Sequence, residues 1–413
     1  MNVLFHELHA ALKDRVTLDP DTVPLPDTGQ TILNFTFVSD EAGILALSGG
    51  GAAAPPLAGE SPEEAEDRAI SDGIALARDS GIAENLSFRY HLLAPAGLAG
   101  EGKAKGVIVL LHGLNERGWA KYLPWASELC RGTGKPVLLF PMAFHMNRTP
   151  ALWNDTRAMR RVSRHRRRLR PELLHSTVSN AAISARLSAD PSRFFWSGLQ
   201  SYRDLAKLAG SIRRGEHPLI AAGASVDLFT YSIGSFLGEI ALCADEGGLF
   251  GDSRLVAFCG GPVFNRLYPA SKFIVDSAAA VDLHSYLVEH LESRMKAFPA
   301  LAEHLSPARG EAGPWFRAFL SYRLETARRE RRLRELAPRI RALALQGDEV
   351  VPPCEVVNTF QGALRDIPIP VDVLEPPCPC RHEDPFPPAP GAKAAEMDAC
   401  FRKAFAGFSR FLE

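Results

Sequence analysis

Residues 226–235 have the sequence V-D-L-F-T-Y-S-I-G-S, and apolar residues continue beyond them through Leu242. The mostly apolar run before Ser232 is typical of a buried strand, and the spacing of the apolar residues after it suits a helix. We therefore expect a strand, a sharp turn and a helix, with Ser232 at the turn. A serine at such a turn is exposed at the sheet edge on a strained backbone, with the helix N-terminus behind it. Small residues are needed two positions before and after the serine. Gly234 meets this need fully and Thr230 only in part.

The pentapeptide T-Y-S-I-G at residues 230–234 resembles the nucleophile elbow of the α/β-hydrolases, in which G-x-S-x-G is usual. Thr230 departs from that pattern. The resemblance covers roughly residues 86–413 and points to no particular subfamily. It implies an α/β fold with a doubly wound, mostly parallel sheet, a serine nucleophile and no cofactor.

The order of apolar runs along the chain predicts the same fold class. Residues 32–38 and 86–93 fit an N-terminal pair of strands, and six further runs fit parallel strands buried on both faces, at 105–112, 136–140, 226–231, 254–258, 341–345 and 371–374. Helical patterns separate these runs, and the last helix, 394–412, closes the chain. Strand, helix and strand at this spacing form right-handed crossover units, so we expect one doubly wound sheet.

Two long segments interrupt the alternation, at 143–190 and 262–338. In α/β-hydrolases, insertions at such places commonly fold over the carboxyl edge of the sheet, so 262–338 is expected to be a helical cap. Its apolar residues are expected either to line a substrate pocket or to form the cap's own core. The residues concerned are Phe264, Phe273, Tyr286 and Leu287. The expected division is an N-terminal extension packed on the core (1–85), the hydrolase core (86–261 and 339–413) and the cap. Within the extension, S-P-E-E at 61–64 predicts the start of a helix that reaches about residue 78.

Composition excludes several classes of function. The 413-residue chain is 46% hydrophobic and 23% charged, with a net charge of −1, so no charge imbalance indicates binding to nucleic acid or to an acidic membrane surface. Residues 1–18 lack the apolar core of a signal peptide, and no stretch is long enough to span a membrane. The seven scattered cysteines fit reduced thiols better than a disulfide framework, so a cytoplasmic protein is expected.

A serine nucleophile needs a base, and the base needs an orienting acid; the α/β-hydrolase order along the chain is serine, acid, histidine. The sequence L-Q-G-D-E-V-V-P at 345–352 follows a late strand and resembles the acid loop of the family. Asp348 is the expected acid, and its neighbour Glu349 is the alternative. A turn residue or a helix cap before Pro352 is the purely structural interpretation of Asp348.

His382 is the expected base, because it is the only histidine after Asp348 and follows the last strand. An imidazole with a pKa near 6.5 can accept the serine proton at neutral pH. Backbone N–H groups must then stabilise the oxyanion of the tetrahedral intermediate. One donor is expected to be Ile233, and by resemblance to the family's His-Gly loop the other is Leu114, with Gly113 allowing the close approach. His112 is expected to order this loop rather than to act as a base.

Three other features have alternative interpretations. Cys378 and Cys380 near His382 suggest a metal site, but no partner cluster completes a ligand set, so no metal is expected. His145 or Arg148 could bind a substrate carboxylate or phosphate, or belong to a solvated loop. The eight arginines between residues 157 and 170 could meet an anionic substrate or nucleic acid, or form a charged helix face balanced by acidic residues.

The sequence therefore predicts a serine hydrolase that cleaves an ester-like acyl bond of a small molecule through an acyl-enzyme. The same machinery cleaves thioester or amide bonds, as in thioesterases, amidases and peptidases, and the motifs do not separate them. The alternative from another class is a non-catalytic ligand-binding protein on the same fold, which predicts that Ser232, Asp348 or His382 lies too far from the others to bond. The sequence leaves the substrate, the physiological pathway and the oligomeric state open.

Overall fold

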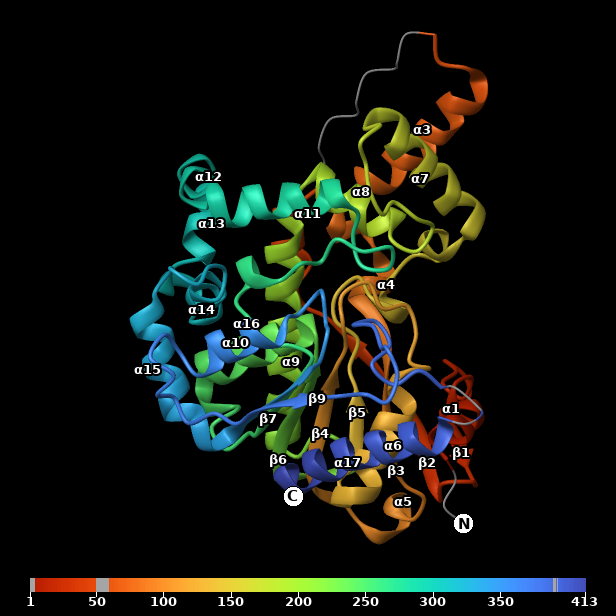
Figure 1. The fold of residues 1–413 in the computed structure, drawn as a ribbon, viewed down its shortest axis with the longest axis vertical. Coiled ribbons are helices and arrows are strands. Elements are labelled where there is room, and N and C mark those ends of the chain that lie inside the picture. The colour runs from red at the N-terminus through yellow and green to blue at the C-terminus, as the bar shows by residue number, and fades with distance from the viewer. Residues whose placement is uncertain (1–3, 50–58, 389–390, 392) are drawn as a thin grey trace.

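A nine-stranded sheet organises the computed structural model, which describes residues 4–49, 59–388, 391 and 393–413 (Figure 1). The strand order is β1-β2-β3-β5-β4-β6-β7-β8-β9. The first three strands pair antiparallel with one another, and β3 also pairs antiparallel with β5: β1 (Thr22–Leu25), β2 (Gln30–Val38) and β3 (Ser87–Pro95). The other six are mutually parallel: β4 (Ala104–Leu111), β5 (Val137–Leu139), β6 (Ile220–Tyr231), β7 (Leu255–Phe258), β8 (Ile340–Leu345) and β9 (Val371–Leu374).

The predicted fold class, α/β with a doubly wound and mostly parallel sheet, is confirmed. Strand β1 was not predicted. Its sequence T-V-P-L is short, contains a proline and is mostly accessible to solvent, so it lacks the apolar run of a buried strand. It forms the edge of the sheet because it pairs along β2, with Val23 opposite Ile32.

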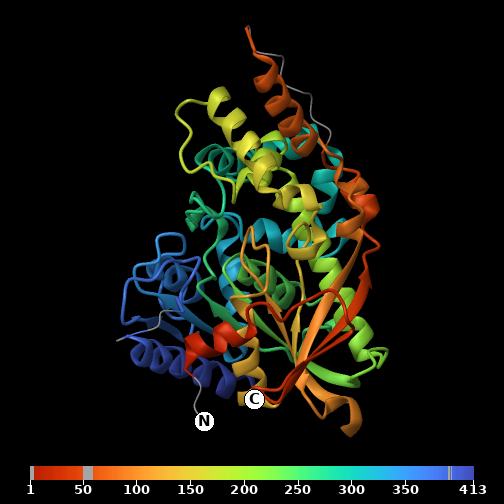
Figure 2. The same cartoon turned by 90° about the vertical axis from the view of Figure 1, so that its right-hand side faces the viewer.

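The residues of the central strands alternate between two hydrophobic layers. In β4, Val107, Val109 and Leu111 face one layer, and Ile108 and Leu110 face the other. The first layer packs on helices α9 (Arg193–Arg213), α10 (Ile233–Ala244), α15 (Thr326–Leu336) and α16 (Pro353–Phe360). The second packs on α1 (Phe5–Leu12), α6 (Tyr122–Thr133) and α17 (Ala394–Leu412); Figure 2 shows α1 in red beside α17 in dark blue. Helices on both faces explain why the parallel strands are almost continuously apolar.

The remaining longer helices lie above the sheet in Figure 1. One group is α3 (Pro62–Ala75), α7 (Thr156–Leu169) and α8 (Ala181–Ala189), which share a separate apolar cluster around Met159. The other belongs to residues 262–338: α11 (Ser277–His284), α12 (Leu291–Ala297), α13 (Pro299–His304) and α14 (Ala312–Ala318). Short helices complete the N-terminal part: α2 (Ala42–Leu45), α4 (Ala83–Leu86) and α5 (Leu98–Glu101). The division of the chain into extension, core and cap stays a prediction.

Helix α3 begins where its sequence predicts. The Ser61 hydroxyl accepts the Glu64 N–H, and the Glu64 carboxylate accepts the Ser61 N–H in return. The helix ends at Ala75, three residues before the predicted end at Arg78. No helix in the described part of the chain has both the length and the apolar character needed to cross a membrane.

The arginine cluster of residues 157–170 lies on α7 and faces acidic side chains. Its main ion pairs are Arg161–Glu66 (2.6 Å), Arg164–Asp67 (2.6 Å), Arg168–Glu64 (2.8 Å) and Arg166–Asp276 (2.7 Å). Three of the four acids belong to α3, so the cluster holds α3 and α7 together. It is a charged helix face balanced by acidic residues.

Candidate active site

Three side chains from distant parts of the sequence meet at the carboxyl edge of the sheet. The Ser232 Oγ lies 2.8 Å from His382 Nε2, and His382 Nδ1 lies 2.8 Å from Asp348 Oδ2. Ser232 directly follows β6, Asp348 follows β8, and His382 lies in the loop after β9. Because these strands are parallel, their carboxyl ends meet at one edge, and the three loops converge there.

Ser232 occupies a strained turn between β6 and α10. Its φ of 56° and ψ of −124° fall in a region that residues with a side chain rarely adopt. The turn also needs Gly234, because a Cβ there would lie 2.6 Å from the Leu111 carbonyl oxygen and 2.8 Å from that of His112. In this conformation the Ser232 side chain contacts His382, and α10 begins at the next residue.

The acid loop distinguishes Asp348 from Glu349. Asp348 is buried, and its Oδ1 accepts the backbone N–H groups of Val350 and Val351 at 2.9 and 2.8 Å. These bonds leave Oδ2 directed at His382. Glu349 is exposed and lines a groove, and the contact with His382 comes from Asp348.

The backbone N–H groups of Ile233 and Leu114 are both available for an oxyanion. Neither donates a hydrogen bond to any residue that the structure describes. Ile233 is the first residue of α10, whose dipole places partial positive charge at this end. Leu114 follows β4, which pairs directly with β6, and both residues border one small apolar cavity.

Two buried side chains, those of His112 and Tyr122, order the loop after β4. His112 Nδ1 donates to the Gly113 carbonyl at 2.8 Å, and its Nε2 accepts the Met142 N–H at 3.0 Å. Burial, and to a lesser degree His145, lowers the pKa of His112 well below its usual value, so the ring is neutral and joins two backbone segments. The Tyr122 hydroxyl accepts the Gly113 N–H at 3.0 Å and donates to Glu116 at 2.8 Å.

Tyr231 supports the loop that carries His382. Its hydroxyl donates to the His382 backbone carbonyl, and its ring stacks on the imidazole with 5.5 Å between centroids. Burial raises the pKa of Tyr231 well above its usual value and keeps the donor protonated. Sequence reasoning missed Tyr122 and Tyr231; the place of Tyr231 directly before Ser232 was the one signal available.

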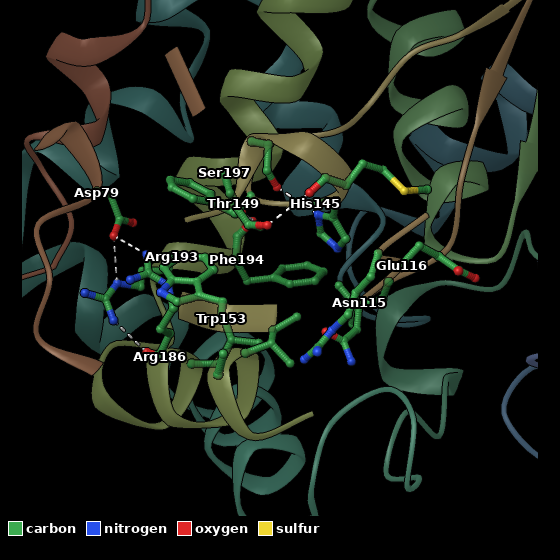
Figure 3. A pocket seen from close by; sticks show the side chains of 18 of the residues that line it. Asp79, Asn115, Glu116, His145, Thr149, Trp153, Arg186, Arg193, Phe194 and Ser197 are labelled. Carbon is green, nitrogen blue, oxygen red and sulfur yellow. Dashed lines mark hydrogen bonds and ion pairs between the residues drawn. The ribbon is translucent and has the colours of Figure 1, made fainter. Parts of the chain in front are cut away.

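Several hollows surround the site in the described part of the chain, among them three that border His145 or His382. The first is an apolar cavity of about 70 Å³ between α9, α10 and α14, bordered by Leu114, Ile233 and His145. The second, also about 70 Å³, adjoins it. Figure 3 shows this cavity with Asp79, Arg186 and Arg193 joined on one side and His145 on the other. The third is a groove of about 1000 Å³ bordered by His382 and Glu349.

Two of the four cap candidates border the groove, and three belong to the main apolar cluster. Phe264 and Phe273 border the groove next to His382, and Phe273 is exposed. Tyr286 and Leu287 are buried in the main apolar cluster. Phe264 belongs to this cluster too, so a role of these residues in a substrate pocket stays a prediction.

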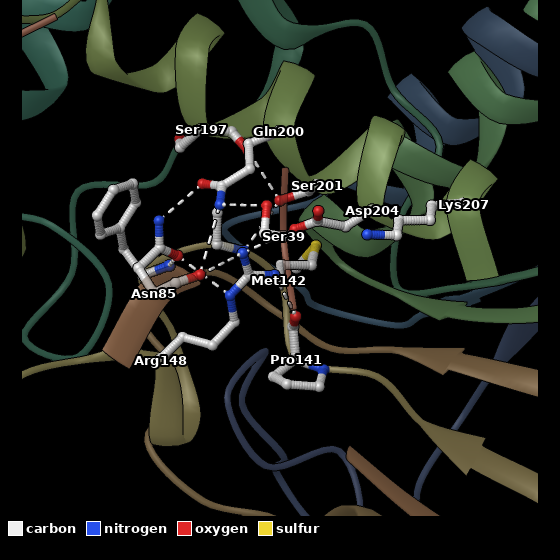
Figure 4. Close-up of polar contacts among 12 residues, drawn as sticks. Ser39, Asn85, Pro141, Met142, Arg148, Ser197, Gln200, Ser201, Asp204 and Lys207 are labelled. Atoms are coloured by element: carbon white, nitrogen blue, oxygen red, sulfur yellow. Dashed lines mark hydrogen bonds and ion pairs between the residues drawn. The ribbon is translucent and has the colours of Figure 1, made fainter. Parts of the chain in front are cut away.

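Arg148 is inaccessible to a substrate carboxylate or phosphate. It is fully buried and pairs with Asp204 at 2.8 Å, and it donates to the carbonyl oxygens of Asn85 and Pro141 (Figure 4). The expected solvated loop is also wrong, because Arg148 fastens its segment to the core.

Near His382, the Cys380 thiol is hydrogen-bonded to the Cys378 carbonyl. In the described part of the chain, no three His, Cys, Asp or Glu side chains are arranged to hold a metal.

The model of a family of unknown function, DUF6051, matches residues 3–413. The chain belongs to this family. No curated protein sequence matches it.

Several solved esterases resemble the chain in structure at low sequence identity. A bacterial heroin esterase is 10% identical over the whole of this chain and 94% of its own, with a TM-score of 0.46. Carboxyl esterase 2 from the fungus Tuber melanosporum is 12% identical over 79% of this chain and 81% of its own, with a TM-score of 0.40. An esterase from Pseudomonas putida is 12% identical over 86% and 93%, with a TM-score of 0.38. Similarity of this degree carries no information about activity.

Proposed function

We propose that this protein is a serine hydrolase that cleaves an ester-like acyl bond of a small molecule through an acyl-enzyme intermediate. The observation that carries the proposal is the pair of 2.8 Å contacts that join Ser232 to His382 and His382 to Asp348. A nucleophile bonded to a base that is itself oriented by a buried carboxylate is the arrangement that activates a serine hydroxyl. The two contacts count against a non-catalytic binding protein, which would not need them.

In the proposed reaction, Ser232 Oγ attacks the acyl carbon while its proton passes to His382 Nε2. Asp348 holds the proton of the imidazole on Nδ1 and stabilises the imidazolium that forms. The N–H groups of Ile233 and Leu114 stabilise the oxyanion. As the tetrahedral intermediate collapses, the bond to the leaving group breaks and the leaving group takes the proton from Nε2. Water then gives a proton to His382, attacks the acyl carbon and releases the acid, and Ser232 regains its proton.

The geometry supports a particular placement of the two halves of the substrate. The leaving group must reach His382 Nε2 to receive a proton, and His382 borders the groove of about 1000 Å³. The oxyanion donors border the apolar cavity of about 70 Å³, which His382 does not border. We therefore propose that the leaving group occupies the groove and the acyl chain the cavity. Residues 264–289 form one wall of the groove, in agreement with a cap role for 262–338.

The experiment is hydrolysis of p-nitrophenyl acetate by Ser232→Ala. Loss of the nucleophile is expected to lower kcat by at least about 10³-fold while circular dichroism and thermal unfolding stay unchanged. Ser87→Ala is the matched control, because Ser87 is exposed on β3 and borders none of the three hollows. Equal rates for Ser232→Ala and Ser87→Ala would contradict the proposal.

A further inference from the structure

His145 borders both small cavities and has one ring nitrogen without a partner. Its side chain is 9% exposed, its Nδ1 lies 2.8 Å from the Ala143 carbonyl oxygen, and its Nε2 is buried with no hydrogen-bond partner among the described residues. A buried polar atom without a partner costs about 1–3 kcal/mol, so such atoms in a native protein usually await water or a ligand. Figure 3 shows the His145 ring at the edge of the cavity.

The hydrogen bonds fix which kind of partner Nε2 needs. A carbonyl oxygen only accepts, so Nδ1 must carry the ring proton to bond Ala143. Burial lowers the pKa of His145 to about 4, so the ring is neutral at physiological pH. Nε2 is therefore an acceptor, and its partner must be a donor such as a hydroxyl group.

The backbone around His145 is built to present this side chain. Phe144 and Met146, the residues on either side, both have positive φ values, of 60° and 51°. Strained residues of this kind persist only where surrounding contacts hold them. Here the Phe144 N–H donates to Asn85, and the Met146 N–H donates to the Glu116 carbonyl, at 3.0 and 3.1 Å.

The surroundings favour a neutral donor over an anion. The lone pair of Nε2 repels a carboxylate or a phosphate. The nearby guanidinium groups of Arg186 and Arg193 are already paired with Asp79 and with backbone carbonyl oxygens. Of the two interpretations of His145 from the sequence, the carboxylate or phosphate ligand is therefore disfavoured, and the solvated loop is wrong because the side chain is buried.

The size of the apolar cavity limits the acyl chain. A cavity of about 150 Å³ holds the six carbons of benzene, so about 70 Å³ holds about three carbon atoms. Phe194, Phe236 and Phe316 form much of its wall, so the chain itself is apolar where it contacts them. One polar group at His145 is compatible with this lining.

We propose that the substrate carries a short acyl chain of about four carbons, carbonyl included, with a hydroxyl group that donates to His145 Nε2. This inference rests on the proposed hydrolase function and names its substrate class. His145 acts in it as a specificity residue: it binds the acyl hydroxyl and takes no part in proton transfer.

The test compares ethyl butyrate with ethyl 2-hydroxybutyrate and ethyl 3-hydroxybutyrate, with the released acid followed by NMR. The wild-type protein is expected to hydrolyse one hydroxy ester with a kcat/KM at least about tenfold above that of ethyl butyrate, because the unhydroxylated chain leaves Nε2 unpaired. Ethyl octanoate is expected to be a poorer substrate than ethyl butyrate. This measurement needs no variant, so a folding defect cannot obscure it.

Two variants then assign the preference to Nε2. In His145→Asn, the amide N–H takes the place of Nδ1–H toward Ala143, but nothing replaces Nε2. This variant is expected to lose the preference for the hydroxy ester over ethyl butyrate. In His145→Gln, the amide oxygen reaches the region of Nε2, and the preference is expected to return in part.

Two results would overturn the inference: a wild-type protein that does not prefer either hydroxy ester, or a preference that survives in His145→Asn. If no ester is hydrolysed, labelling with a fluorophosphonate separates the failures. A labelled Ser232 would leave the hydrolase proposal standing and overturn the substrate class. An unlabelled Ser232 would overturn both.

Discussion

Gly238 leaves the space that Thr230 fills. A Cβ on Gly238 would lie 2.9 Å from Thr230 Cγ2 and 2.6 Å from Leu255 Cδ1. Thr230 stands where the elbow usually has glycine, and its hydroxyl is hydrogen-bonded to the Val256 carbonyl and to Ser235 at 2.8 and 2.9 Å. The elbow therefore tolerates a larger residue before the serine because α10 has a glycine that faces it.

Gly238→Ala is expected to destabilise the protein. Alanine in a helix normally stabilises by up to about 1 kcal/mol relative to glycine. Here the added methyl group overlaps Thr230 and Leu255, and overpacking of a core costs about 1–3 kcal/mol. Urea unfolding measures the difference. Gly407→Ala is the matched control, because a Cβ at this position in α17 would meet no atom within 4 Å and should stabilise. A Gly238→Ala variant as stable as Gly407→Ala would show that the space is not needed.

Asp348→Asn is expected to lower kcat by about 10⁴-fold with little change in folding. The asparagine oxygen can still accept the Val350 and Val351 N–H groups, but its amide donates to His382 Nδ1. That bond moves the ring proton to Nε2, which then cannot accept the proton of Ser232. Steady-state hydrolysis of p-nitrophenyl acetate measures the loss.

Glu349→Gln is the control for this assignment, because Glu349 adjoins Asp348 in sequence and is exposed. It is expected to change kcat less than about tenfold, because the hydrogen bond to His382 comes from Asp348 and the exposed Glu349 contributes only a screened charge. A larger loss of kcat for Glu349→Gln than for Asp348→Asn would show that Glu349, and not Asp348, orients His382.

Arg148→Met is expected to destabilise the protein by about 3–5 kcal/mol at pH 8, because it leaves the buried Asp204 carboxylate unpaired. Burial already raises the pKa of Asp204, and loss of Arg148 raises it further. The folded variant then binds a proton more readily than the unfolded chain. Its loss of stability relative to the wild-type protein therefore becomes smaller as the pH falls toward 5. Urea unfolding at both pH values measures this change.

Asp204→Asn in the Arg148→Met background separates charge from packing. The double variant carries no buried charge at this site, so its stability is expected to recover in part and to lose the pH dependence of the single variant. A deficit in Arg148→Met that is equal at pH 8 and pH 5 would show that the ion pair is not its cause.

The parallel strands and the loops that follow them could be predicted from the sequence, because strands buried on both faces appear as uninterrupted apolar runs. Ser232, Asp348 and His382 could be selected because each follows such a run in a fixed order. Their 2.8 Å contacts are structural observations that the order alone does not provide.

Other parts of the site could not be predicted, because they depend on contacts between distant segments. Tyr231 and His382 are 151 residues apart in the sequence, and no local pattern predicts the hydrogen bond between them. The orientation of His145 depends on the positive φ values of its neighbours, which are not glycines and give no sequence signal. The short edge strand β1 becomes a strand only through its pairing with β2.

The central claim is that Ser232 is a nucleophile activated by His382. Treatment of the protein with a fluorophosphonate, followed by peptide mass mapping, tests this claim most directly. One covalent adduct on the peptide that contains Ser232 is expected in the wild-type protein, and none is expected in His382→Ala at matched time and concentration. No adduct on the wild-type protein, or an adduct at another residue alone, would contradict the claim.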